Sequence, residues 1–323
     1  MLLITGASGF LGNHIVDEML AAGYEVKALV RNPEKRKFSW GSMVDIVEGD
    51  LLDVESLARA MEGVEYVIHA ASIVSFWKKR HKEMRKANIE GTANLVNVCL
   101  DSDISKLIHV SSIGALGKDT KTQWIQEDTP WNASDASSVY AQTKYAQELE
   151  VYRGIAEGLE AVIVNPGLIL GTTKNWEQNT GKLFSIVSKG LRYYNPGGTG
   201  VVGVKDVARA IRLVLERDIP TGERFVLVGE NLTQRELLNK IAQAIDKTPP
   251  KKKVPGWASM VVGHLSHRIS SFTGKEPVIT PESIRSSLKN YLYNGSKICS
   301  HGFTYTPIDD VIQESAQAFL AQN

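Results

Sequence analysis

The chain is poor in cysteine, with only Cys99 and Cys299 among 323 residues. Two thiols are too few for the disulfide framework that holds together small secreted domains, and they suit a reducing compartment. At this length, with 43% apolar residues, the chain can bury a large core without such cross-links. We therefore expect one large domain and a smaller second lobe.

Long apolar runs and an excess of one charge are also missing. No run approaches the roughly 20 residues that cross a bilayer, and the best candidate, residues 257–262, is interrupted by Gly263 and His264. The first predicted strand begins at residue 2, so we expect no signal peptide. The net charge of +1 argues against an extended nucleic-acid surface. These features predict a cytoplasmic protein without a membrane span or a nucleic-acid partner.

The first dozen residues carry the strongest local pattern. Residues 2–4 are a short apolar run that suits a buried parallel strand, and a helical pattern begins near Phe10. Between them, Gly6 permits a tight turn, Gly9 leaves bare backbone for a pyrophosphate, and Gly12 lets the helix pack closely on the sheet. The free N–H groups at the helix start would face the phosphates. The pattern predicts a dinucleotide-binding turn.

Strand and helix patterns then alternate along the first half of the chain. Further strands are predicted at 24–30, 44–47, 66–68, 106–110 and 161–164, with helices at 54–61, 82–100 and 136–157. This alternation predicts an α/β fold with a Rossmann-type, doubly wound parallel sheet, and ligands at the carboxyl ends of its strands.

The pattern loosens after residue 165. Loops are predicted at 171–181 and 193–203, helices at 204–217, 233–245 and 308–321, a strand at 224–228 and a solvated linker at 249–253. We expect a dinucleotide-binding domain over 1–165, to which some later segments return. Residues 166–323 would form mainly a smaller, mostly helical substrate lobe.

Charged residues beyond the second and third strands bear on the cofactor. An enzyme that selects NAD usually carries Asp or Glu about 20 residues beyond the glycines. This slot holds Arg31, followed by Lys35, which favours the 2′-phosphate of NADP over NAD; a solvated charge run is the alternative. After the third strand, Asp50 can accept the adenine amino group, whereas Asp53 is the better helix cap. His69 is predicted to be a core histidine.

The candidate chemistry lies in Ser112, Tyr140 and Lys144. The tyrosine and lysine are four residues apart on a predicted helix, so their side chains share a face. A neighbouring ammonium should lower the pKa of the phenol and let it exchange a proton near neutral pH. Ser112, just past the fifth strand, would hold the same substrate oxygen, with Ser111 as the runner-up. A second copy of this spacing, Tyr293 to Lys297, spans an Asn-Gly turn and is not expected to share a helix.

These motifs together resemble the extended short-chain dehydrogenase/reductase family, in its dihydroflavonol reductase, 3β-hydroxysteroid dehydrogenase and NAD-dependent epimerase branch. The matching stretches are 5–12, 49–51, 69–71, 88–94, 110–112, 140–144 and 165–167. The resemblance implies that Ser112, Tyr140 and Lys144 are catalytic, and that the helices at 82–100 and 136–157 pair across a homodimer. It implies a cofactor surface made of Gly6, Ser8, Gly9, Phe10, Leu11, Gly12, Arg31, Lys35, Asp50, Leu51, Ala70, Ala71, Ser72, Asn88, Val110, Tyr140, Lys144, Pro166, Gly167 and Ile169.

Three functions stay open at this point. The first is NADP(H)-dependent interconversion of a ketone and a secondary alcohol on an apolar or aromatic molecule, which Trp124, Trp131, Trp176 and the loop 73–77 favour. Ile113-Gly114 stands where dehydratases carry an acidic pair, which argues against elimination. The second is a sugar-nucleotide epimerase, whose nucleotide Arg192 and Asn195 could hold. The third is a nucleotide-sensing subunit without turnover.

No metal site is predicted. His264 and His267 share a face of a predicted helix, but the sequence offers no third ligand near them, which a zinc site would need.

Overall fold

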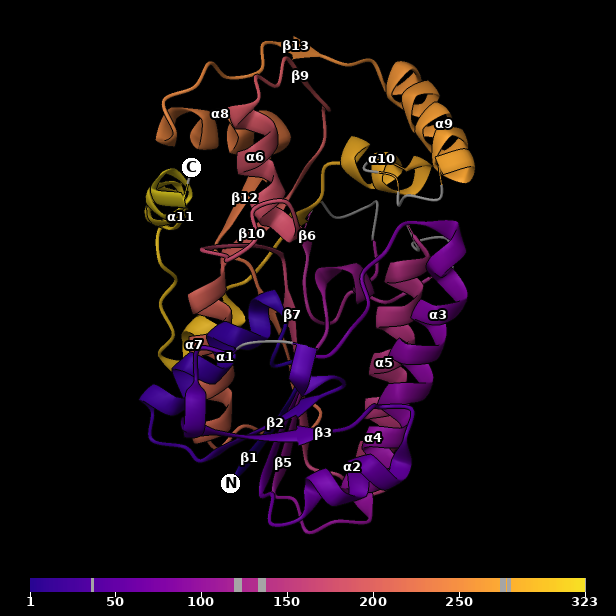
Figure 1. Ribbon diagram of the computed structural model, residues 1–323, viewed down its shortest axis with the longest axis vertical. Coiled ribbons are helices and arrows are strands. Elements are labelled where there is room, and N and C mark those ends of the chain that lie inside the picture. Colours follow the sequence, from indigo (N-terminus) through magenta and orange to yellow (C-terminus); the bar gives the residue numbers. More distant parts are fainter. Residues whose placement is uncertain (36–37, 119–123, 133–137, 274–276, 278–279, 323) are drawn as a thin grey trace.

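The computed structural model describes residues 1–323 except 36–37, 119–123, 133–137, 274–276, 278–279 and 323. The described residues form a seven-stranded parallel sheet in the order β11-β7-β5-β4-β1-β2-β3 (Figure 1). Its strands are β1 (Leu2–Thr5), β2 (Val26–Val30), β3 (Val44–Glu48), β4 (Tyr66–His69), β5 (Lys106–Val110), β7 (Ala161–Pro166) and β11 (Arg224–Leu227). The strand order places a topological switch point between β1 and β4, where ligands of such sheets bind.

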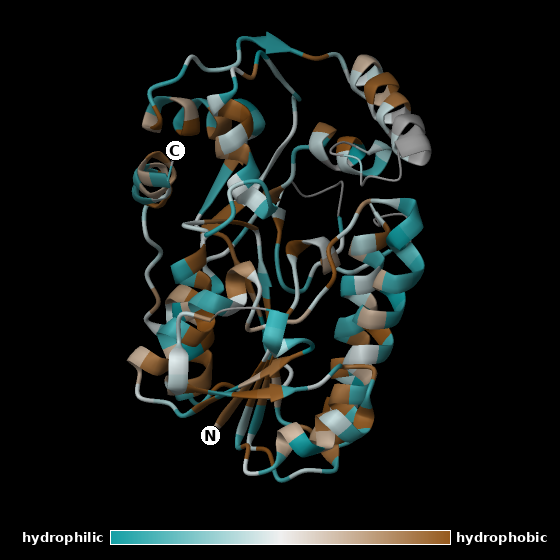
Figure 2. Cartoon of the chain, in the orientation of Figure 1, coloured by the Kyte–Doolittle hydropathy of each residue, from teal (hydrophilic) through white to brown (hydrophobic). Residues whose placement is uncertain are grey.

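Helices cover both faces of this sheet because side chains alternate along each strand. Leu2 and Ile4 of β1 face one core, which is closed by α1 (Phe10–Ala21) and α7 (Val204–Glu216). Leu3 faces the opposite core, which is closed by α2 (Val54–Met61), α4 (Gly91–Leu100) and α5 (Val139–Ala156). In Figure 2 the strands of this sheet are largely hydrophobic, as a sheet buried on both faces requires.

The helix predicted at 82–100 is not uniform. It consists of α3 (His81–Arg85), a π-helical turn at Lys86–Glu90 and α4. The helix predicted at 136–157 is α5, whose described part starts after Ser138; the Ser138 hydroxyl accepts a hydrogen bond of 3.1 Å from the N–H of Ala141. Residues 136–137 lie outside the described part.

The second half of the chain builds a smaller sheet, β12-β10-β8, from β8 (Leu168–Leu170), β10 (Gly198–Gly203) and β12 (Glu230–Thr233). The helices α6 (Lys182–Ser188), α8 (Gln234–Ala244) and α11 (Ile308–Gln322) share its apolar core. The helices predicted at 204–217, 233–245 and 308–321 are thus present within one residue at either end. Whether residue 165 is a domain boundary stays a prediction.

The predicted loop at 193–203 is wrong. β9 (Tyr193–Tyr194) and β10 lie there, and the glycines of β10 allow close strand packing. A Cβ on Gly198 would lie 2.8 Å from the carbonyl oxygen of Leu232. The predicted linker at 249–253 is wrong at its end, because β13 (Lys252–Lys253) pairs with β9. β6 (Trp124–Ile125) likewise pairs with β14 (Leu292–Tyr293).

Two further helices, α9 (Gly256–Thr273) and α10 (Pro281–Leu288), lie together at one end of the molecule (Figure 1). Within the described part of the chain, no helix is both long enough and apolar enough to cross a membrane.

Candidate functional site

The glycine turn joins β1 to α1 at the switch point. Gly6 has φ +75°, and a Cβ there would lie 2.6 Å from the backbone nitrogen of Ala71, just past β4. A Cβ on Gly12 would lie 2.0 Å from the carbonyl oxygen of Gly6. Both positions therefore exclude any side chain. Gly9 is exposed and precedes α1, and no described side chain caps that helix start. The turn fits a dinucleotide pyrophosphate, because it offers bare backbone and uncapped N–H groups.

The other residues predicted to hold the cofactor follow neighbouring strands of the parallel sheet. The small residues Ala70, Ala71 and Ser72 come after β4, Arg31 and Lys35 after β2, and Asp50 and Leu51 after β3. Pro166 ends β7, Gly167 follows it, and Ile169 lies in β8. Because the carboxyl ends of parallel strands meet at one edge, the topology brings these residues to the same edge as the glycine turn.

Arg31 and Lys35 are both exposed, and Lys35 Nζ donates a hydrogen bond of 3.2 Å to Asn32 Oδ1. Asp50 accepts from the N–H of Leu52 (2.9 Å), while Asp53 caps α2 by accepting from the N–H of Ser56 (3.3 Å). The prediction that Asp53 is the helix cap is therefore confirmed. The carboxylate of Asp50 stays half-buried at the sheet edge.

Ser112 and Tyr140 lie together. Ser112 lies two residues beyond the end of β5, and its hydroxyl accepts a hydrogen bond of 3.0 Å from the N–H of Gly114. Burial raises the pKa of Tyr140 to about 12, and a hydrogen bond with Ser112 opposes this shift. Ser112 contributes to the pKa of Tyr140 and Ser111 does not, so we take Ser112 rather than Ser111 as the partner of the tyrosine.

The pKa of Tyr140 thus moves in the opposite direction to the one predicted from the Tyr-x-x-x-Lys spacing. The cause is burial of the phenol, and Lys144 does not offset it. Lys144 is itself buried and donates hydrogen bonds to the carbonyl oxygen of Val110 (2.9 Å) and to Gln147 Oε1 (3.0 Å). Burial also lowers the pKa of Lys144 to about 7, and the Glu148 carboxylate opposes this. A lysine that is partly neutral and held towards β5 does little to favour the phenolate.

Lys144 belongs to a buried hydrogen-bonded chain that the sequence did not reveal. Gln147 Nε2 donates to Thr92 Oγ1 (2.7 Å), which in turn donates to the carbonyl oxygen of Asn88 (2.6 Å). Thr92 Oγ1 must then accept from His69 Nε2 (2.9 Å), so neutral His69 accepts at Nδ1 from Thr5 Oγ1 (2.7 Å). The chain links the candidate lysine to the strand that carries the glycine turn.

His69 is a satisfied core histidine, as predicted. It is fully buried, and burial lowers its pKa to about 3. Its neighbour His109 lies with its ring centroid 5.2 Å away, and neither of its ring nitrogens has a hydrogen-bond partner among the described residues. Burial, helped by Lys144 and His69, lowers the pKa of His109 well below its usual value. Both imidazoles are therefore neutral.

Asn88 and Asn165 each hold a loop of the site in place. Asn88 lies in the π-helical turn, exchanges hydrogen bonds of 2.8 and 2.9 Å with the backbone of Ile73, and also donates to Thr143. A π-bulge is frequent at functional sites, and simple helical periodicity cannot predict it. Asn165 donates to the carbonyl oxygen of Ser112 (2.9 Å) and to Glu148 (2.6 Å).

Glu148 and Arg224 also belong to this site, and the sequence pattern did not identify either of them. Glu148 is buried, pairs with Arg224 at 2.9 Å, and burial raises its pKa against that pairing. The signal that could have found it is its position four residues after Lys144, on the same face of α5.

Aromatic residues lie beside the candidate proton donor. Phe76, in the loop 73–77, meets Tyr140 edge to face with ring centroids 6.2 Å apart, and Trp131 stacks on Tyr145 at 4.4 Å. Trp176 does not join them, because it packs with Phe184 and Phe319 in the core around the smaller sheet. The prediction of a substrate contact at Trp176 is therefore not supported.

The second tyrosine–lysine pair is separate from this site. Tyr293 lies in β14 and accepts a hydrogen bond of 3.1 Å from Lys118, and burial raises its pKa. Lys297 contacts Glu223 and the carbonyl of Arg224 instead. The two side chains do not share a helix face, as the Asn-Gly turn indicated.

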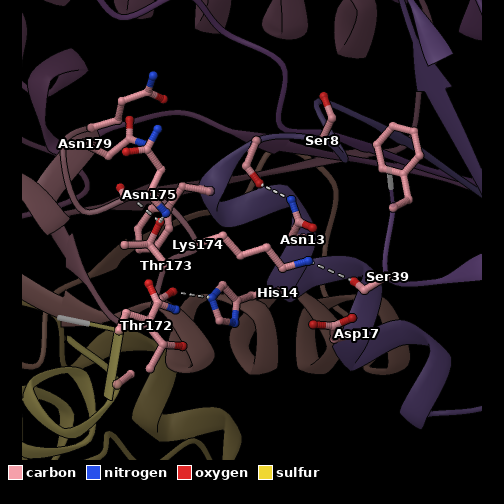
Figure 3. Close-up of a pocket in the computed structure, with 16 residues that line it drawn as sticks. Ser8, Asn13, His14, Asp17, Ser39, Thr172, Thr173, Lys174, Asn175 and Asn179 are labelled. Carbon is pink, nitrogen blue, oxygen red and sulfur yellow. Dashed lines mark hydrogen bonds between the residues drawn. The ribbon is translucent and has the colours of Figure 1, made fainter. Parts of the chain in front are cut away.

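A cleft of about 670 Å³ opens beside the glycine turn (Figure 3). Lys174 Nζ reaches Ser39 Oγ (3.2 Å) across it, and His14 Nε2 donates to the carbonyl of Thr172 (3.0 Å). The lining includes Ser8, Gly9 and Phe10 but none of the three candidate catalytic residues. This cleft therefore does not contain the candidate catalytic side chains, and we assign the chemistry to the residues that can perform it.

No group of ligating side chains that could hold a metal is present among the described residues. The side chains of His264 and His267 lie outside the described part of the structure.

The chain is similar to known proteins in both sequence and structure. A sequence model of the NAD dependent epimerase/dehydratase family matches residues 2–228. The solved structure of gox2253 is 30% identical, with a TM-score of 0.84, over 100% of this chain and 98% of that one. The UDP-glucose 4-epimerase of Thermus thermophilus, solved with NAD, is 25% identical with a TM-score of 0.77, over 100% and 99%. A Synechocystis protein provisionally named dihydroflavonol 4-reductase is 27% identical over 91% of this chain and 87% of its own length.

Proposed function

Since this chain belongs to the NAD dependent epimerase/dehydratase family, we propose that it interconverts a ketone and a secondary alcohol on an apolar or aromatic small molecule, with NADP(H) as cofactor. The observation that carries the proposal is the contact between Ser112 and Tyr140, with the edge of Phe76 against the tyrosine ring. A phenol, a hydroxyl and an apolar wall meet at one point.

Each residue of this group has a distinct role in the proposal. Tyr140 exchanges a proton with the substrate oxygen, and Ser112 hydrogen-bonds the same oxygen and orients it. Lys144 holds the nicotinamide ribose once it leaves the carbonyl of Val110. When bound, the nicotinamide supplies or accepts the hydride. Phe76 excludes water from the reacting carbon and favours an apolar substituent.

The ionisation of Tyr140 supports the reductive direction. With its pKa at about 12, the phenol is protonated at neutral pH and is ready to donate to a carbonyl oxygen. Oxidation of an alcohol requires the phenolate, which desolvation of the hydroxyl disfavours. The chain is therefore better suited to ketone reduction.

NADP is proposed over NAD on the basis of Arg31 and Lys35. Both side chains are exposed beyond β2, where the adenosine 2′-position lies in this fold. A guanidinium and an ammonium there can pair with a 2′-phosphate.

The epimerase alternative loses one of its supports. Asn195 donates to Ser287 Oγ and accepts from Ser259 Oγ, both at 2.8 Å, so it joins α9 to α10 rather than facing a nucleotide. Elimination is disfavoured by Ile113 and Gly114, which follow Ser112 where an acidic pair would be needed. The homodimer through the helices at 82–100 and 136–157 and the cytoplasmic location stay predictions.

A substrate panel tests the proposal. The protein is incubated with NADPH and apolar or aromatic ketones, then with sugar nucleotides, and both cofactor and product are followed. Stoichiometric conversion of NADPH and ketone into NADP⁺ and alcohol is expected. Inversion of a sugar nucleotide without cofactor consumption would establish the epimerase instead. Tight cofactor binding with no turnover of any substrate would favour the sensing subunit.

A further inference from the structure

The described side chains of helix α9 are arranged in an unusual way. Small residues face the protein, and large apolar residues face the solvent. The inward side of α9 carries Ser259, Gly263 and Ser270, all buried. Its outward side carries Trp257, Val261, Val262 and Leu265, which are 74%, 58%, 51% and 58% exposed. At about 100° per residue these four side chains span an arc of roughly 140°. An ordinary surface helix shows the opposite arrangement.

Packing against α10 fixes this orientation. Ser259 Oγ donates a hydrogen bond of 2.8 Å to Asn195, and a Cβ on Gly263 would lie 2.6 Å from Ile284 Cδ1 on α10. A larger side chain at Gly263 would push the two helices apart. The small inner face thus lets α9 lie close to α10, and the large apolar side chains are left facing solvent.

The segment around this apolar face is basic. Between Lys247 and the start of α9 at Gly256 the chain carries Lys247, Lys251, Lys252 and Lys253 and no Asp or Glu, although the whole chain has a net charge of only +1. Lys251, Lys252 and Lys253 are all exposed and directly precede α9. β13 lies at the top of the molecule, and a short connection leads from it to α9 at the upper right (Figure 1), where apolar residues band the coloured part of the helix (Figure 2). Apolar side chains and cations therefore share one outer end of the molecule.

We propose that this end, α9 with Lys251–Lys253, docks on the surface of an anionic lipid bilayer. The helix lies in the plane of the headgroups, with Trp257 and Leu265 in the upper acyl region and the lysines against lipid phosphates. A second copy of the chain would cover the apolar arc equally well, but a twofold contact through it would bring two lysine clusters together. A neutral apolar partner would offer the lysines no opposite charge.

Vesicle binding of the full-length protein tests the inference, which does not rest on the proposed reaction. Co-sedimentation is measured with vesicles of phosphatidylcholine and phosphatidylglycerol, and with phosphatidylcholine alone. We expect binding to the first that weakens as salt is raised, with a blue shift of tryptophan emission that is lost in Trp257→Ser. Leu265→Ser should weaken binding about tenfold. Lys251→Glu with Lys252→Glu should weaken it by about fivefold for each lysine.

The control is Leu320→Ser on α11, where the side chain is exposed to a similar degree, 53%. It should bind vesicles like the unmodified protein. Equal weakening by Leu320→Ser and Leu265→Ser would overturn the inference, as would the absence of binding to anionic vesicles at low salt. Concentration-dependent self-association that Trp257→Ser abolishes, without vesicle binding, would overturn it in favour of an interface between copies of this chain.

Discussion

Lys144 Nζ and Gln147 Oε1 are joined by a buried hydrogen bond of 3.0 Å, one turn apart on α5. Gln147 also donates a hydrogen bond to Thr92, which is connected through His69 to Thr5 at the end of β1, directly before the glycine turn. Burial lowers the pKa of Lys144 to about 7, the Glu148 carboxylate opposes this, and the amide of Gln147 adds no charge of its own. Position 147 is therefore a place where a carboxylate can be introduced beside the ammonium.

Gln147→Glu should raise the pKa of Lys144, because a carboxylate would replace the amide oxygen. If the ammonium is the active form, the alkaline limb of the kcat/KM profile moves up by about one pH unit. Gln147→Leu should move it down. The ammonium can also be titrated without turnover, by NMR of labelled lysine with Lys144→Arg as the assignment control. Identical titrations in all three proteins would refute this role for Gln147.

Tyr140→Phe should lower kcat by about a hundredfold or more while cofactor affinity stays nearly unchanged, since only the transferable proton is lost. Tyr293→Phe is the matched control, because it removes a buried phenol that lies outside the site. Turnover is compared with cofactor binding measured by fluorescence. Normal turnover in Tyr140→Phe together with loss in Tyr293→Phe would mean that the wrong motif was chosen.

Arg31→Asp should weaken NADPH binding by about tenfold or more and leave NADH binding nearly unchanged or stronger, because the charge opposite a 2′-phosphate is reversed. Arg59→Asp, on the exposed side of α2, makes the same change of charge away from the sheet edge. Dissociation constants for both cofactors are measured by titration. Equal affinity of the unmodified protein for NADPH and NADH would contradict the proposed selectivity.

His69 and His109 should make the fold sensitive to acid. Their pKa values lie far below the usual 6.5, so the unfolded chain binds more protons as the pH falls below that value. Their contribution to stability is complete above pH 6.5 and is lost on acidification, by about 1 kcal/mol per pH unit for each imidazole. His109→Phe should therefore flatten the fall in the urea unfolding midpoint between pH 6.5 and 5. His301→Phe, outside the sheet core, should leave the slope as it is.

The alternation of short apolar runs with helical patterns was enough to predict the parallel sheet, because most of its strands, such as β1, β2 and β7, are buried on both faces. Residues 193–203 could not be assigned correctly, since glycines that break a pattern in the sequence also allow strands to approach closely. Ser112, Tyr140 and Lys144 could be proposed from spacing alone. Lys144's hydrogen bonds to Val110 and Gln147 depend on which side chains meet across the sheet, so the pKa of Tyr140 was expected to move in the wrong direction.

The place of β11 in the sheet has a consequence for biosynthesis. β11 pairs with β7, yet it is the last strand of the large sheet to leave the ribosome, nearly 60 residues after β7. Until then, the nascent chain carries β7 as an unpaired and largely apolar edge, which invites pairing with other chains. A fragment that ends at residue 165 would keep this open edge permanently. Such a fragment should aggregate when it is expressed alone, and chaperones should hold the growing chain until residue 227 has emerged.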